Sequence, residues 1–490
     1  MLTSNALDQP FYDRAHEIDA LDRAWRRTAV RGQMMLLYGR RRVGKTFLLQ
    51  RFFLSDRERA ARTCYLLAQQ TSALEQRRDA AERVLAAFPT PGVAVEDLAV
   101  SWRALLRYVS ASAGTGPICL ILDEFPYLVA QAPELPSLLQ SWWDTEGVGA
   151  RLLVVLCGSQ LSAMAALGSP SAPLYGRFDA GRILLEPMRY DEVAAFYAGK
   201  SRFGPRDVLT MYGALGGTPR YHAMADTSLD MPGALVDLLF RHRSPLDEEI
   251  RFLLAGEQIR DPAPYNAVLT AIASGETSFG KIQARTGLER GSLAGALETL
   301  MELSWIRRER PFGESNDRRS IYVAADPFLT FWFRFVRPAA GERAFTAGER
   351  IWAERVRPHL ADYMGRHVFE GICRQWLERH GRDRLGFAAR RIGRYWSRDG
   401  QIEIDLVAES ESAGMLFAEC RWKENGQLDL NDLVRLKAKV AGLPNANWRR
   451  SPTFALFTTG AVAPPLRAVG DSAPDLHLVG LTDLLLDQLG

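Results

Sequence analysis

The segment with the most specific chemistry is a phosphate-binding pattern near the N-terminus. Residues 39–46 read Gly-Arg-Arg-Arg-Val-Gly-Lys-Thr and fit G-x-x-x-x-G-K-[ST], the P-loop. Glycine lets the backbone turn so tightly that its N–H groups point at phosphate oxygens. Lys45 could then reach the β- and γ-phosphates, and the Thr46 hydroxyl could bind Mg²⁺. The pattern predicts ATP and Mg²⁺ as cofactors. The expected binding loop is Gly39, Arg40, Arg41, Arg42, Val43, Gly44, Lys45, Thr46 and Phe47.

Two carboxylates come directly after an apolar run further along the chain. Hydrolysis of a bound nucleotide would require such groups. Residues 118–122 are Ile-Cys-Leu-Ile-Leu and lead directly into Asp123 and Glu124. Asp123 would hold the Mg²⁺ shell, directly or through water, as a Walker B aspartate does. Glu124 would polarise the attacking water as a general base. An acidic pair without a catalytic role is the alternative, but the position downstream of a P-loop favours catalysis.

A third apolar run, residues 151–157, leads into Gly158, Ser159 and Gln160. Ser159 is the expected contact to the γ-phosphate and the water, with Gln160 in reserve, although a serine here could simply cap a helix. Arg177 and Arg182 are candidates for an arginine finger that stabilises transition-state charge. Most arginines are solvated surface residues, which is the alternative for both.

These side chains need elements that bring them to one edge of a sheet. Residues 34–38 predict a strand before the P-loop and residues 47–53 a helix after it, and a second strand is expected at 63–67. The presence of Glu124, with another strand between the two motifs, indicates the hydrolytic (ASCE) branch of P-loop proteins. The predicted fold is therefore an α/β P-loop core with a parallel sheet.

Composition sets the wider limits. A chain of 490 residues suggests three or four domains, and 47% hydrophobic with 24% charged residues is typical of folded protein. The net charge of +3 restricts any argument for nucleic acid to local patches. The five cysteines form no C-x-x-C pair, so neither a disulfide framework nor a zinc site is indicated. Without a signal-like or membrane-length apolar run, we expect a cytoplasmic protein and no membrane partner.

Several motifs together resemble the archaeal-type ATPase family of the AAA+/STAND group. The matching segments are Phe11-x-x-Arg14-x-x-Glu17, residues 38–46, residues 122–128, residues 157–159, residues 174–177 and residues 216–221. The resemblance covers most of residues 1–335. It implies a core over residues 1–187 and a small helical lid with connector over residues 188–260. It also implies that Arg177 acts on a neighbouring subunit's nucleotide in a homo-oligomer. Gly216–Arg220 would begin the lid element that faces the nucleotide, with Arg220 at a variable position of that motif.

Residues 261–340 have the pattern of a winged helix-turn-helix. Helices are expected at 265–273, 278–284 and 292–303, and strands at 305–308 and 320–323 flank a wing at 311–317. The third helix could enter a major groove of DNA. Six arginines could reach phosphates, namely Arg285, Arg290, Arg307, Arg308, Arg318 and Arg319. The alternative is a winged helix used for packing within the chain.

Residues 341–490 run helix, strand, strand, strand, helix, strand, which resembles the α/β restriction-endonuclease-like folds of the PD-(D/E)xK class. The resemblance implies that Asp405 and Glu419 bind Mg²⁺, with Glu370 as the helix carboxylate, and that the metal generates a nucleophilic water. The expected lysine two residues after Glu419 is Arg421, which cannot give up a proton, so Lys423 could substitute. An inactive nucleic-acid-holding domain and a pure interaction domain are the alternatives.

Seven arginines between 379 and 398, with Tyr395 and Trp396 among them, could form a phosphate-binding patch or a solvated face over packed aromatics. Taken together, the sequence predicts an Mg²⁺-dependent ATPase of AAA+/STAND type, coupled to binding or processing of nucleic acid, with DNA favoured. Hydrolysis would change the lid angle and move the winged helix and the C-terminal domain. The alternative is a nucleotide-gated signalling switch whose C-terminal domain binds a protein and cleaves nothing.

Overall fold

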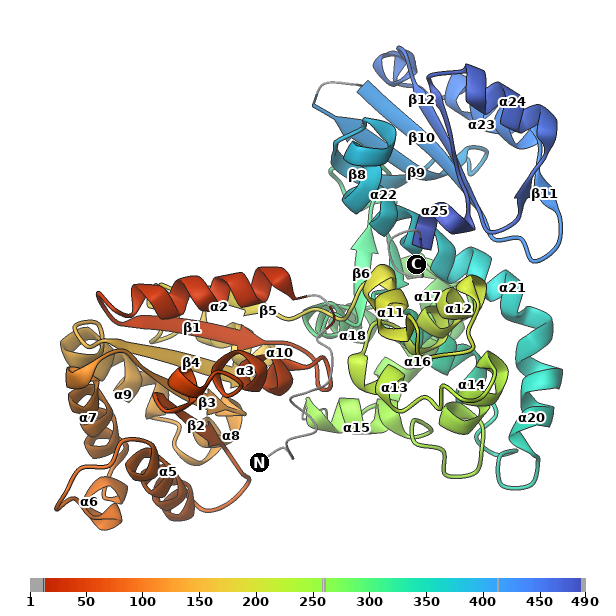
Figure 1. The fold of residues 1–490 in the computed structure, drawn as a ribbon. Coiled ribbons are helices and arrows are strands. Elements are labelled where there is room, and N and C mark those ends of the chain that lie inside the picture. Colours follow the sequence, from red (N-terminus) through yellow and green to blue (C-terminus); the bar gives the residue numbers. More distant parts are fainter. Residues whose placement is uncertain (1–11, 13, 258, 260, 412–413, 486–490) are drawn as a thin grey trace. The chain divides into compact units, whose positions relative to one another are not determined.

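The computed structural model describes residues 12 and 14–485, except for 258, 260, 412 and 413. The chain divides into two compact units, Met1–Pro187 and Met188–Gly490. The first unit is drawn in red to yellow in Figure 1, and the second runs from yellow-green to blue.

A five-stranded parallel sheet forms the centre of the first unit. Its strands are β1 (Gln33–Tyr38), β2 (Thr63–Leu67), β3 (Ile118–Asp123), β4 (Leu152–Gly158) and β5 (Gly181–Leu184). The spatial order is β2-β3-β4-β1-β5, so β4 separates the strand before the P-loop from the strand that ends at Asp123. Because all five strands are parallel, the residues that follow β1, β3 and β4 meet at one edge of the sheet.

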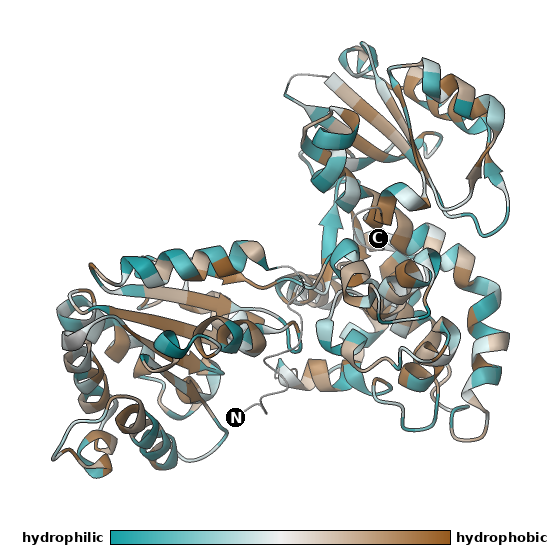
Figure 2. Ribbon diagram, in the orientation of Figure 1, coloured by the Kyte–Doolittle hydropathy of each residue, from teal (hydrophilic) through white to brown (hydrophobic). Residues whose placement is uncertain are grey.

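Helices cover both faces of this sheet because its strands are apolar on both sides. On one face, α2 (Ala15–Arg27) and α3 (Lys45–Phe53) pack on odd-numbered strand residues such as Met35 and Val155. On the other face, even-numbered residues such as Leu36 and Val154 contact a set of helices. These are α5 (Ala73–Ala87), α6 (Val95–Ala99), α7 (Trp102–Ser112), α8 (Phe125–Gln131), α9 (Leu135–Trp142) and α10 (Leu161–Leu167). In Figure 2 the central strands are brown, whereas α2 carries teal and brown stripes.

The second unit begins with helices and continues into a small three-helix group with a hairpin. The first helices are α11 (Tyr190–Tyr197), α12 (Pro205–Leu215), α13 (Pro219–Ala223), α14 (Met231–Leu239) and α15 (Glu249–Gly256). The group that follows contains α16 (Ala263–Ala273), α17 (Phe279–Thr286) and α18 (Arg290–Glu302), then the antiparallel strands β6 (Ile306–Glu309) and β7 (Ile321–Ala324). The aromatic stretch after β7 is buried core, since Phe328, Phe331 and Phe333 are at most 1% exposed.

The C-terminal part is a mixed sheet between helices. Its strands are β8 (Ala389–Trp396), β9 (Glu403–Ser410), β10 (Gly414–Arg421), β12 (Thr453–Thr458) and β14 (Leu476–Val479), in the order β14-β12-β10-β9-β8. The pairs β8–β9 and β9–β10 are antiparallel, and the pairs β10–β12 and β12–β14 are parallel. The helix α22 (Phe369–Leu385) packs on one face. The other face is covered by α23 (Leu430–Ala441) and α24 (Pro464–Ser472).

The predicted fold class is confirmed for the parallel-sheet core and for the mixed α/β C-terminal part. The strand β10 ends at Arg421 and does not reach Lys423, the residue expected to substitute for the missing lysine. Among the described residues, no helix combines the length and the apolar character needed to cross a membrane.

Candidate functional site

The P-loop connects β1 to α3 in a conformation that depends on its glycines. A Cβ at Gly39 would lie 2.4 Å from the carbonyl oxygen of Leu185, so only glycine fits beside the end of β5. Gly44, the N-cap of α3, has a φ of 97°, and Arg42, two residues earlier, has a φ of 68°. Left-handed backbone at a non-glycine residue is strained, and such positions concentrate at binding sites. The loop therefore directs its backbone and the first turn of α3 toward one point.

Lys45 is the first residue of α3, and its side chain turns back across the loop. Its Nζ donates to the carbonyl oxygens of Gly39 at 2.7 Å and Arg40 at 2.9 Å. The residue is only 6% exposed, and this burial lowers the pKa of the Lys45 ammonium, although Glu124 and Asp123 oppose the shift. A desolvated ammonium inside a loop of backbone amides is suited to an anion such as a polyphosphate.

Asp123, at the end of β3, accepts three hydrogen bonds at this edge of the sheet. Its Oδ2 accepts a hydrogen bond from Thr46 Oγ1 at 2.9 Å and another from the hydroxyl of Tyr65. Its Oδ1 accepts from the backbone N–H of Glu124 at 2.9 Å. A hydroxyl and a carboxylate this close are hard oxygen donors of the kind that Mg²⁺ prefers. Thr46 and Asp123 therefore fit an Mg²⁺ ion that also contacts a nucleotide's phosphates.

Glu124 lies in the left-handed region with a φ of 54°, which turns its side chain toward β4. Both of its carboxylate oxygens accept from Ser159 Oγ, at 3.0 and 2.9 Å. The Ser159 N–H also donates to Oε2 at 3.2 Å. Ser159 is 2% exposed, so this contact is shielded from solvent. Gln160 is also buried, at 8% exposed, and precedes α10.

Four arginines of the first unit bear on the predicted site. Two of them belong to the P-loop or contact it, and the other two bond to residues outside it. Arg14 supports the loop, since its Nη2 donates to Glu186 O at 2.8 Å and Val43 O at 3.4 Å. Arg41 donates to the hydroxyl of Tyr127 at 2.8 Å. In contrast, Arg177 forms a bidentate pair with Asp144 at 2.8 and 2.7 Å, and Arg182 donates to Gly168 O at 2.8 Å. Phe11, the start of the N-terminal motif, lies outside the described residues.

The C-terminal carboxylates Asp405 and Glu419 lie together between β9 and β10, but two cations accompany them. Arg421 contacts Glu419 Oε2 and lies 3.4 Å from Asp405 Oδ2. Lys439 Nζ, from α23, is 2.5 Å from Glu419 Oε1. Lys423 does not join this cluster, because its Nζ donates to Gln427 O at 2.7 Å and lies 3.7 Å from Asp432 Oδ2. Burial and Asp405 raise the pKa of Glu419.

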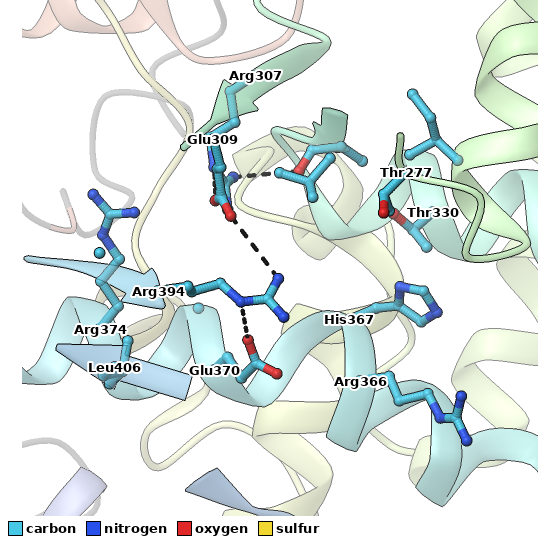
Figure 3. A pocket seen from close by; sticks show the side chains of 15 residues that line it. Thr277, Arg307, Glu309, Thr330, Arg366, His367, Glu370, Arg374, Arg394 and Leu406 are labelled. Atoms are coloured by element: carbon cyan, nitrogen blue, oxygen red, sulfur yellow. Dashed lines mark hydrogen bonds and ion pairs between the residues drawn. The ribbon is translucent and has the colours of Figure 1, made fainter. Parts of the chain in front are cut away.

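Glu370, the predicted helix carboxylate, lines a cavity of about 90 Å³ within the second unit (Figure 3). Arg394 extends into this cavity between two acids, with its Nε 3.1 Å from Glu370 Oε2 and its Nη1 3.9 Å from Glu309 Oε2. Burial raises the pKa of Glu370 to about 8, against the opposing effect of Arg394. Among the described residues, no three His, Cys, Asp or Glu side chains converge in a way that could hold a metal ion.

The cavities and the P-loop do not coincide. A larger cavity in the first unit, of about 210 Å³, lies between Leu66, Gln76 and Trp102, and no residue of 39–47 lines it. The site is defined by the side chains that converge at the sheet edge, because a nucleotide held by the backbone amides of a loop needs no enclosed cavity.

Three of the six arginines expected to reach DNA form ion pairs within the hairpin. Arg307 pairs with Glu309 at 2.8 Å, Arg308 pairs with Asp317 at 2.8 Å, and Arg319 pairs with Glu314. Arg285, Arg290 and Arg318 are exposed. In the C-terminal patch Tyr395 is 5% exposed and belongs to the core, as the packed alternative predicted.

Sequence reasoning missed three residues of these clusters. Tyr65 was read only as part of a strand, and Arg394 only as one of seven arginines. Lys439 lies in a helix 20 residues after Glu419 and belongs to no motif. The one usable signal was alternation, since Tyr65 falls on the face of β2 opposite to Cys64 and Leu66.

Comparison with known proteins agrees with this geometry. Residues 11–224 match a family model described as an ATPase domain predominantly from Archaea, and residues 332–433 match one described as "Archaea bacterial proteins of unknown function". An uncharacterized protein of Methanocaldococcus jannaschii, MJECL04, is 29% identical over 442 residues, which are 88% of this chain and 93% of that protein.

One solved structure is similar in fold, and a second is a weaker match. The Walker-type ATPase PABY2304 of Pyrococcus abyssi has a TM-score of 0.51 at 20% identity, covering 67% of this chain and 99% of that one. The ORC2 protein of Aeropyrum pernix, in ADPNP-ADP complexes, has a TM-score of 0.43 at 15% identity, covering 70% of this chain and 99% of that one. By the family models, residues 11–224 of this chain match the archaeal-type ATPase domain, and residues 332–433 match a domain of archaeal and bacterial proteins of unknown function.

Proposed function

We propose that the first unit binds ATP with Mg²⁺ and hydrolyses it at the edge formed by the P-loop, Asp123 and Glu124. The observation that carries this proposal is the 2.9 Å contact between Thr46 Oγ1 and Asp123 Oδ2, because it joins the P-loop to the acidic strand end. Mg²⁺ bound between these oxygens and the phosphates would neutralise charge that develops on the transferred phosphoryl group.

Each residue has a separate task in this proposal. Lys45 would exchange its two carbonyl partners for the β- and γ-phosphates, and its low exposure strengthens that attraction. Glu124 would accept the proton of the attacking water, while Ser159 fixes the direction of its carboxylate. Arg177 would act only after leaving Asp144, as contact with a neighbouring subunit would allow.

Substitution of Lys45 and Glu124 tests the ATPase proposal. We expect Lys45→Ala to weaken ATP binding, and Glu124→Gln to lower kcat about 10²–10⁴-fold with little change in nucleotide affinity. Steady-state hydrolysis and binding of a fluorescent ATP analogue measure the two effects. Glu75→Gln, on the exposed surface of α5, is the matched control. An unchanged rate in both variants would contradict the proposal.

We further propose that the second unit couples hydrolysis to nucleic acid, with DNA favoured. The helix–helix–helix–hairpin order of residues 263–324 is that of a winged helix. Lys281, Arg285 and Arg290 are exposed on α17 and at the start of α18, where backbone phosphates of a duplex could be reached. The domain limits 1–187, 188–260, 261–340 and 341–490 remain part of this proposal.

For the C-terminal domain we propose binding of nucleic acid without cleavage. A domain that cleaves nothing is also compatible with the signalling switch. Asp405 and Glu419 carry two negative charges, and Arg421 with Lys439 supply two positive ones. A divalent cation would have to displace at least Arg421 from partly buried carboxylates, which is unfavourable. Arginine also cannot act as a proton donor in the way that a lysine can.

A nicking assay tests the non-cleaving proposal. We expect supercoiled DNA to stay intact with Mg²⁺ or Mn²⁺ in the presence of ATP. Asp405→Ala and Glu419→Ala should therefore change stability rather than nicking. Nicking that requires a divalent metal and disappears in both variants would overturn this proposal and restore the nuclease interpretation.

A further inference from the structure

The hydroxyl of Tyr65 contacts the carboxylate that the proposed metal site depends on. Tyr65 lies in β2, the edge strand that pairs with β3, and its hydroxyl donates to Asp123 Oδ2. Thr46 Oγ1 donates to the same oxygen. Since Oδ1 accepts from the Glu124 N–H, both oxygens of Asp123 have assigned donors.

Asp123 needs these donors because it is only 1% exposed. A buried carboxylate is stable only when hydrogen bonds replace its lost hydration. Two of the donors come from segments that form the proposed site, namely α3 and the end of β3. The remaining donor, Tyr65, comes from β2, a strand that carries no sequence motif.

Binding of Mg²⁺ would change the role of only one of these donors. The Thr46 hydroxyl would have to turn its oxygen toward the metal, so its hydrogen bond to Asp123 would be lost or rearranged. The Tyr65 hydroxyl cannot do the same, because it is attached to a rigid ring that packs with the core around Cys119 and Ile121. Tyr65 would thus keep Asp123 oriented while Thr46 changes partner.

We propose that Tyr65 is a positioning residue for the metal: its hydroxyl holds the Asp123 carboxylate in the orientation that accepts Mg²⁺. This inference rests on the proposed ATPase function and adds a residue outside the P-loop and the Asp123–Glu124 pair. Without the hydroxyl, Asp123 can rotate away from Thr46, and part of the metal's binding energy is spent on restoring its orientation. Nucleotide binding without metal depends on the loop and Lys45, so it does not need Tyr65.

The test is Tyr65→Phe in the full chain, with hydrolysis measured against Mg²⁺ at saturating ATP. We expect the Mg²⁺ concentration for half-maximal activity to rise about tenfold, the order of a lost hydrogen bond to a charged group. We expect kcat at saturating Mg²⁺ to stay within about twofold, and affinity for a fluorescent ATP analogue in EDTA to stay unchanged. Tyr127→Phe is the matched control, because its hydroxyl accepts from Arg41 beside the same loop.

The outcomes separate the two proposals. If Asp123→Asn leaves hydrolysis unchanged, the proposed metal site is wrong, and the role of Tyr65 falls with it. If Asp123→Asn abolishes hydrolysis but Tyr65→Phe leaves the Mg²⁺ dependence unchanged, only the role of Tyr65 is overturned. Equal weakening of metal-free nucleotide binding in Tyr65→Phe would indicate a purely structural tyrosine and would also overturn it. Thermal unfolding and a Mn²⁺ titration by electron paramagnetic resonance, with and without ATP, keep the test valid if the activity is low.

Discussion

At the scale of single residues, the sheet edge is held together by hydrogen bonds among the residues proposed to act there. Glu124 accepts three bonds from Ser159 alone, and Asp123 accepts from Thr46, Tyr65 and the Glu124 N–H. Such a network fixes each carboxylate before any substrate arrives. Preorganised groups lower a reaction barrier because they need not be oriented during the reaction.

Ser159 provides a measurable part of this order. In Ser159→Ala the two Oγ contacts to Glu124 disappear and only the backbone N–H bond remains. A hydrogen bond is worth about 1 kcal/mol net, so we expect kcat to fall about fivefold, with nucleotide affinity unchanged. Ser110→Ala, which removes a hydroxyl that accepts from Trp142, is the control for a half-buried, hydrogen-bonded serine elsewhere in the unit. An unchanged kcat would show that the backbone bond alone orients Glu124.

The residues of a site were predictable where a sequence motif specifies them. They were not predictable where only the folded structure brings them together. The structure brings Lys45, Thr46, Asp123, Glu124 and Ser159 to one edge, although their roles stay predictions. The P-loop spacing and two strand ends were enough to place them there. Lys439 reaches Glu419 from the separate helix α23, and a local sequence pattern cannot predict a contact between two separate elements. Lys423 failed to reach the carboxylates because β10 stops two residues earlier.

At the scale of elements, the hairpin of β6 and β7 is held against the C-terminal sheet. Its loop residue Phe312 is 6% exposed, belongs to the core of that sheet, and lies 5.5 Å from the ring of Trp448. The Phe312 N–H donates to Arg394 O at 2.7 Å, and Arg319 Nη1 donates to Trp396 O at 2.7 Å. If the proposed wing binds DNA, this docking prevents it from entering a groove independently of the C-terminal sheet. A bound duplex would then meet both as one surface.

Phe312→Ala tests this docking. Removing a buried phenyl ring costs about 3–5 kcal/mol in a core, and we expect a loss near the lower value, because this site is at the edge of the cluster. Hydrogen exchange should accelerate in residues 306–324 and in β8, where the backbone contacts lie. Phe345→Ala is the matched control, since Phe345 is 93% exposed and should change stability by less than about 0.5 kcal/mol. Unchanged exchange in Phe312→Ala would mean that the backbone contacts suffice.

Elements were the most predictable level, because apolar periodicity is strong here. The strand expected at 63–67 is observed with those bounds. The docking of the wing was not predictable from its composition. Its loop is polar, and the single aromatic residue that anchors it becomes meaningful only when β8 and Trp448 lie beside it.

At the scale of the whole molecule, the net charge of +3 does not decide whether the chain binds nucleic acid. Two exposed basic sets compete for that role within the second unit. One consists of Lys281, Arg285 and Arg290 on α17 and α18, and the other of Arg382, Arg390 and Arg398 around β8. Because each phosphate contact releases a counterion, the two sets can be distinguished by the salt dependence of binding.

We expect double-stranded DNA to stimulate ATP hydrolysis, and the stimulation to weaken as salt is raised. Changing Lys281, Arg285 and Arg290 to alanine should abolish stimulation and reduce the slope of log K against log salt by about 2–3, since each contact contributes about 0.9. Basal hydrolysis should be unchanged, because the P-loop and Asp123 belong to the first unit. The matched set is alanine at Arg382, Arg390 and Arg398. If that set abolishes stimulation instead, the C-terminal domain is the nucleic-acid surface. If hydrolysis is indifferent to single- and double-stranded DNA at all salt concentrations, the signalling switch is the better account, and the output of the second unit is a protein contact.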